Sequence, residues 1–150
     1  HALLFMYDEY FLHKKRGLSR KEINSGILDG IIFLVLICFT IFTRFTPTLA
    51  AVYIILSLLS CGLIVKNEFF YPENLSRKER IIHALLYVFH PLILFAFYIS
   101  WKMDFFTSNI AYWMLQLGYL ALAFKAVSFH IIYWNYVHDR ENKKRKRIKV

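Results

Sequence analysis

Four long apolar segments constrain this chain more than any other feature. They cover residues 27–45, 49–65, 81–101 and 110–137. A helix needs about 20 apolar residues to cross the hydrocarbon core of a bilayer. With 58% hydrophobic and only 19% charged residues, the chain is too apolar for an ordinary soluble domain. We therefore expect an all-α, polytopic transmembrane helical bundle with four spans.

Basic residues are predicted to lie mainly on one side of this bundle. Five Lys and Arg precede the first span, four lie between the second and third, and seven lie in residues 140–149. The other two loops hold one each, Arg44 and Lys102. Because basic loops stay in the cytoplasm, both ends of the chain are predicted to be cytoplasmic. We expect an integral protein of a bacterial inner membrane, with membrane lipids rather than nucleic acid as partners of its basic residues.

A short motif occurs twice. Asp-Glu-Tyr-Phe at 8–11 is followed by Leu-Ser-Arg-Lys-Glu at 18–22, and Asn-Glu-Phe-Phe at 67–70 is followed by the same five residues at 75–79. Each copy precedes two spans, so both copies should insert in the same orientation. The sequence predicts one transmembrane domain, residues 1–138, and a basic tail, residues 139–150. The domain would contain the end of an N-terminal helix and two parallel helix-hairpin repeats, at about 8–66 and 67–138.

Ionisable residues in or beside the spans gather toward the predicted cytoplasmic side. Such residues are costly to bury in a membrane and mark candidate functional sites. Glu9 and His13 are four residues apart, as are Glu79 and His83, so each pair shares one face of a helix. His90 lies two turns beyond His83 on the same face. We expect a metal site where the repeats meet, with ligands drawn from His1, Asp8, Glu9, His13, Asp29, Glu68, Glu79, His83 and His90.

The mixture of carboxylate and imidazole ligands favours iron or manganese, and zinc less strongly. Iron or manganese would suit an oxidoreductase acting on a lipid-soluble substrate, whereas zinc would activate water for hydrolysis. A haem held by two of His83, His90 and His130 is the least favoured cofactor, because His90 and His130 are predicted at different depths. The sequence contains no nucleophile–base pair, glycine-rich phosphate loop or thiol pair that would support another chemistry.

The same polar residues also have structural explanations. Glu79 lies three residues after Ser76 and could complete a capping box at the start of a helix. His90 could hydrogen-bond a backbone carbonyl that Pro91 leaves free. If such contacts account for all of them, the chain is a non-catalytic scaffold or an accessory subunit bound to other membrane subunits.

Two further expectations concern residues within the spans. Asp29 and Lys125 are predicted at matching depth, about 24 and about 22 Å from the outer ends of their spans, so they could form an ion pair. The indole rings of three residues near the span ends are expected to lie at the membrane interface. These residues are Trp101, Trp113 and Trp134.

Several motifs resemble those of a family of small bacterial integral membrane proteins. In the first half they are His-Ala-Leu-Leu-Phe at 1–5, Asp8-Glu9-Tyr10, His13 and Leu28-Asp29; in the second half they are 66–69 and 83–91. In that family position 67 is usually Asp and position 26 usually His. This chain has Asn67 and Gly26, so the resemblance implies that it lacks two candidate ligands.

A weaker similarity, of design only, is to membrane di-iron hydroxylases and desaturases. Their histidine clusters also lie on the cytoplasmic side, but this chain lacks their HxxxH and HxxHH boxes.

Overall fold

The computed structural model describes residues 1–70, 75–105 and 109–138, apart from the side chains of residues 16 and 67–70. This part of the chain contains helices and no strands. The elements are α1 (Ala2–Tyr7), η1 (Asp8–His13), α2 (Lys14–Arg16), α3 (Arg20–Phe42), α4 (Pro47–Phe70), α5 (Arg77–Lys102), α7 (Ile110–Ile132) and η2 (Tyr133–Val137).

Four helices are long and apolar enough to cross a membrane, as predicted: Arg20–Phe42, Pro47–Lys66, Arg77–Lys102 and Ile110–Val137. The first begins seven residues before its predicted start. The reason is a capping box, in which the Ser19 side chain accepts from the Glu22 backbone and the Glu22 side chain accepts from the Ser19 backbone. Helix α4 begins at Pro47, where the fixed φ of proline suits the first turn, and continues past the predicted end to Phe70.

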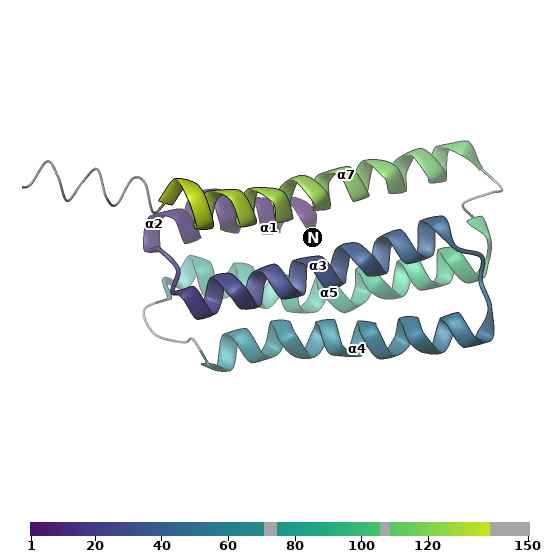
Figure 1. Cartoon of the computed structure of the whole chain (residues 1–150), viewed down its shortest axis with the longest axis horizontal. Helices are drawn as coiled ribbons and strands as arrows, with labels where there is room; N and C mark the ends of the chain where they lie inside the picture. The colour runs from purple at the N-terminus through teal and green to yellow at the C-terminus, as the bar shows by residue number, and fades with distance from the viewer. Residues whose placement is uncertain (71–74, 106–108, 139–150) are drawn as a thin grey trace, which may run out of the picture.

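The four long helices lie side by side and alternate in direction (Figure 1). Helix α3 packs against α4, α5 and α7, and α4 packs against α5. The starts of α3 and α5 meet the ends of α4 and α7 at one end of the bundle. We call this the basic end, because Arg20, Lys21, Arg77 and Lys78 lie there. The arrangement as two repeats stays a prediction.

The N-terminal helix is a fifth element inside this arrangement. It runs from Ala2 through η1 to Arg16 and packs against α7 and α5 in the half of the bundle nearest the basic end (Figure 1). Gly17 ends it with φ of +82°, a left-handed conformation that glycine adopts without strain. Chain reversal at this glycine allows α3 to begin beside the end of α2.

The other half of the bundle is a packed apolar core. Leu36, Ile37 and Leu94 are almost fully buried there, together with the rings of Tyr53 and Trp101. The two polar groups of these rings are satisfied, since Tyr53 donates to the Leu94 carbonyl and Trp101 to the Thr43 carbonyl. The packing of these side chains holds the helices in register in this half of the bundle.

Large apolar side chains also cover the outside of the bundle. Ile55, Leu58, Phe95 and Phe124 are each more than 60% exposed. Exposed apolar surface on all four long helices is costly in water and is what a lipid environment stabilises. The apolar outer surface, like the length and hydropathy of the four helices, thus indicates an integral membrane protein.

Candidate metal centre

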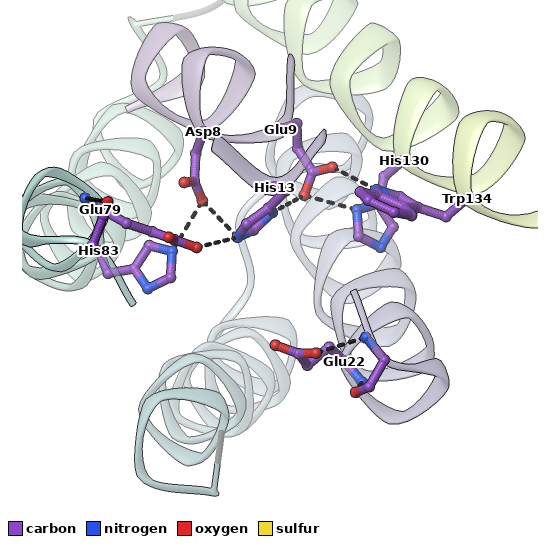
Figure 2. Close-up of polar contacts among 10 residues, drawn as sticks. Asp8, Glu9, His13, Glu22, Glu79, His83, His130 and Trp134 are labelled. Atoms are coloured by element: carbon purple, nitrogen blue, oxygen red, sulfur yellow. Dashed lines mark hydrogen bonds and ion pairs between the residues drawn. The ribbon is translucent and has the colours of Figure 1, made fainter. Parts of the chain in front are cut away.

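Four side chains from two helices meet near the basic end of the bundle. One ligand atom from each of Asp8, His13, Glu79 and His83 lies within 4.8 Å of the other three. Asp8 Oδ2 is 3.2 Å from His13 Nε2 and 3.1 Å from His83 Nε2 (Figure 2). Glu79 Oε1 lies 3.9 Å from the same nitrogen of His13. We call these four residues the carboxylate–histidine cluster.

The backbone of η1 explains how Asp8 and His13 come together. These two residues are five apart in the sequence, and in a regular α-helix they would not lie one above the other. The turn from Asp8 to His13 is a π-helix, whose hydrogen bonds join residues five apart. The wider turn brings both side chains to the same point on the helix surface.

Helix α5 supplies the other two members from its first two turns. Ser76 caps this helix by accepting from the Glu79 backbone, which is one half of the predicted capping box. The Glu79 side chain at the same time turns toward His13. His83 follows one turn later on the same face, so the predicted pairing of Glu79 with His83 on one helix face is confirmed.

The two carboxylates of the cluster are buried, yet one of their oxygens is unpaired in the described part of the chain. Asp8 is 2% exposed and Glu79 3% exposed. Asp8 Oδ1 has no hydrogen-bond partner among the described residues, although Oδ2 contacts both histidines. A buried, unpartnered carboxylate oxygen costs free energy unless a donor or a cation approaches it. The cluster therefore has the ligand atoms and an unshared carboxylate electron pair that can bind a cation.

Glu9 is adjacent to the cluster but contacts the far side of the His13 ring. Its Oε1 lies 2.9 Å from His13 Nδ1 and 2.8 Å from His130 Nδ1, and its Oε2 accepts from Trp134 Nε1 at 3.1 Å (Figure 2). Burial by itself would raise the pKa of Glu9, but the hydrogen bonds from His13 and His130 outweigh it and hold this pKa well below its usual range. Glu9 is thus an ionised carboxylate that orients His13 rather than a fifth member of the cluster.

Three other predicted ligands lie deeper and do not join the cluster. Tyr119 bonds His1 Nδ1 at 3.0 Å, His1 Nε2 is 3.3 Å from His90 Nδ1, and His90 Nε2 is 2.9 Å from Ser60 Oγ. Ser60 donates its hydroxyl proton to Asp29 at 3.0 Å. We call this series the deep chain: Tyr119, His1, His90, Ser60 and Asp29.

The bond from Ser60 to Asp29 determines which group donates in each of the other bonds of the deep chain. Because Ser60 gives its only proton to Asp29, it must accept from His90 Nε2. A neutral His90 ring then accepts at Nδ1 from His1 Nε2, and His1 Nδ1 accepts from Tyr119. His90 is therefore held by Ser60 and His1. The expectation that it bonds a backbone carbonyl left free by Pro91 was wrong.

Two expectations for residues in the spans are wrong. Asp29 bonds Ser60, and Lys125 is exposed on α7 without an ion pair to Asp29 in the described part of the chain. Trp134 does not lie at an interface; it is fully buried and donates to Glu9. Trp101 is also buried, whereas Trp113 is exposed as expected. The side chain of Glu68 lies outside the described residues.

A cavity of about 140 Å³ separates the cluster from the deep chain. Asp8, His13 and His83 line it near the basic end, and His1 and His90 line it deeper in the bundle. Most of the remaining wall is apolar and comes from residues such as Phe5, Phe33 and Leu86. Helices α3 and α7 approach closely beside it, because Gly26 has no Cβ where the His130 ring lies.

The sequence did not predict four residues that complete these networks. In the sequence, Ser60 and Tyr119 are ordinary residues of apolar spans. Trp134 was expected to lie at the membrane interface. His130 was considered only as the least favoured haem ligand, yet it is 3% exposed and its Nε2 donates to the Ile23 carbonyl. No sequence signal identified the role of His130, because its place opposite Gly26 depends on how α3 and α7 pack.

Comparison of the chain with family models gives no match, and none of the curated proteins or solved structures matches it. The site must therefore be interpreted from its own geometry.

Proposed function

We propose that this chain is an integral membrane protein that binds one divalent metal ion at Asp8, His13, Glu79 and His83. The single observation that supports this most strongly is the convergence of four donors from two helices within 4.8 Å. The apolar outer surface and four span-length helices support a membrane location. The count of basic residues places the basic end, and so the metal, on the cytoplasmic side in this proposal.

The donor set limits which metals suit the site. Two imidazole nitrogens and two carboxylates favour iron, manganese or zinc over copper(I), which prefers sulfur. Glu9 adds the usual support of a metal-binding histidine, since it accepts from His13 Nδ1 while Nε2 faces the cluster. The same contact fixes the ring so that the lone pair of Nε2 is directed at the ion.

The reaction we propose is an iron- or manganese-dependent oxidation of a lipid-soluble substrate, with dioxygen as the electron acceptor. It is supported by the apolar cavity that borders the cluster inside the bundle. Such a cavity accepts molecules that are mainly apolar and carry a few polar groups. Bound iron or manganese would supply one-electron chemistry, and His13, oriented by Glu9, would hold the ion beside the cavity.

A second candidate function is the non-catalytic scaffold. The direct contacts of Asp8 with His13 and His83 favour it, because buried ion pairs between helices can fix their relative positions without a metal. The two candidates differ in what a metal ion does to the protein.

The experiment is metal analysis of detergent-purified protein for the native chain and for the variants Asp8→Asn, His83→Ala and His138→Ala. His138 serves as a control because it packs against Trp134, outside the cluster. We expect one equivalent of metal in the native chain and in His138→Ala, and loss of it in the other two. A metal-free native protein whose melting temperature is unchanged by added Mn²⁺, Fe²⁺ or Zn²⁺ would establish the scaffold instead.

A further inference from the structure

The N-terminal helix and α5 bring polar residues together as two pairs, Asp8 with His83 and His1 with His90. We call each pair a rung. The two helices run in opposite directions, so Asp8 faces His83 at 3.1 Å and His1 faces His90 at 3.3 Å. Seven residues separate the rungs on each helix, which corresponds to about 10.5 Å along the bundle. The rung nearer the basic end belongs to the carboxylate–histidine cluster, and the deeper one belongs to the deep chain.

The cavity between the rungs has the size of an aromatic ring. Its volume is about 140 Å³, and its wall between the rungs is formed by side chains such as Phe5, Phe33, Leu86 and Val127. An apolar protein cavity of roughly 150 Å³ can remain free of water and bind benzene. The tight approach of Val127 to Gly30 leaves little room for expansion on the α3 side. A compact, flat molecule therefore fits better than a coiled acyl chain.

The distance between the rungs indicates where polar atoms of this molecule would lie. An oxygen bound to the metal needs about 2.1 Å, and a hydrogen bond to the deeper rung needs about 2.8 Å. About 5.6 Å of the 10.5 Å then remains between the two oxygens of the ligand. This is the separation of oxygens on opposite carbons of a six-membered ring, and it is too long for neighbouring positions.

We propose that the cavity binds a hydroquinone-type ring, with one oxygen on the metal and the other at His1 and His90. The proposal rests on the metal site of the proposed function. The ligand carries no anionic group, because no described Lys or Arg side chain lines the cavity, whereas Asp8, Glu9, Glu22 and Asp29 do. The His1 N–H can turn from His90 Nδ1 to a ligand oxygen, and the hydroxyl proton of the ligand then takes its place as the donor to His90 Nδ1.

Zinc-loaded protein in lipid nanodiscs provides the test, because zinc does not react with the ring. Zinc content is measured first, and binding is then measured by calorimetry for hydroquinone, resorcinol and p-xylene. These rings are similar in size, but resorcinol has its oxygens closer together and p-xylene has none. We expect hydroquinone to bind at least about tenfold more tightly than either. An alkyl-substituted hydroquinone that binds more tightly still would identify a lipid-borne ring, and equal affinity a free one.

Cavity-filling variants locate the binding. Ala126→Leu and Ala123→Leu place extra carbons in the cavity, whereas Ala121→Leu adds them on the exposed face of the same helix. We expect the first two variants to lose hydroquinone binding and Ala121→Leu to bind hydroquinone like the native protein. All three variants should retain zinc. Zinc-loaded native protein that binds no ring, or binds all three equally, would overturn this inference and leave the metal site standing. Failure to load zinc would overturn the proposed function as well.

Discussion

Replacement of Glu9 by Gln tests how the cluster is held in place. Glu9 is ionised and receives N–H groups from His13, His130 and Trp134. Gln keeps the shape but removes the charge, and in either orientation its NH2 group faces at least one ring nitrogen that also donates. Loss of a carboxylate that orients a metal-binding histidine lowers metal affinity by about 10- to 100-fold, or about 1.4–2.8 kcal/mol. Loss of the buried charge partner of His130 should also destabilise the metal-free protein by about 3 kcal/mol.

Metal affinity is measured by competition with a chelator, and stability by thermal unfolding of the metal-free protein. The control is Glu22→Gln, because Gln also completes a capping box and the Glu22 side chain bonds the Ser19 backbone, outside the cluster. Glu22→Gln should change neither quantity. An affinity of Glu9→Gln within twofold of the native value would refute the orienting role, and a loss beyond about a thousandfold would make Glu9 a ligand.

Three other variants follow from the packing around the two networks. Gly26→Ala should destabilise the protein by about 1–3 kcal/mol in thermal unfolding, because its Cβ would lie 2.9 Å from His130 Nε2; an unchanged melting temperature would contradict the close approach of α3 and α7. Trp134→Phe should cost about 1–2 kcal/mol by removing one donor to Glu9, and unaltered stability would mean that this bond contributes nothing. Ser60→Ala should cost about 1–3 kcal/mol while metal content stays at the native value, since it breaks only the deep chain; loss of metal would show that the two networks are not separate.

The spans could be predicted because the constraint is simple. Lipid requires a continuous apolar helix, and runs of that length are visible in the sequence. The pair Glu79 and His83 was predictable for a similar reason, since a spacing of four residues fixes a common face in any regular helix. In both cases local sequence alone determines the geometry.

Contacts that depend on irregular backbone or on helix packing could not be predicted. The contact between Asp8 and His13 depends on the π-helical turn of η1, and no sequence pattern predicted that turn. The grouping of Glu9 with His130 and Trp134 needs α1 to pack against α7, and these helices are more than 100 residues apart in the chain. Sequence analysis therefore found most of the polar residues but assigned all of them to one site, where the structure separates a cluster, its supporting carboxylate and a deeper chain.

The most direct test of the metal centre is X-ray absorption spectroscopy of the purified, metal-loaded protein. We expect oxygen and nitrogen ligands at about 2.0–2.2 Å, with scattering from two imidazole rings. A spectrum with sulfur ligands, or with no imidazole, would contradict a centre built from Asp8, His13, Glu79 and His83.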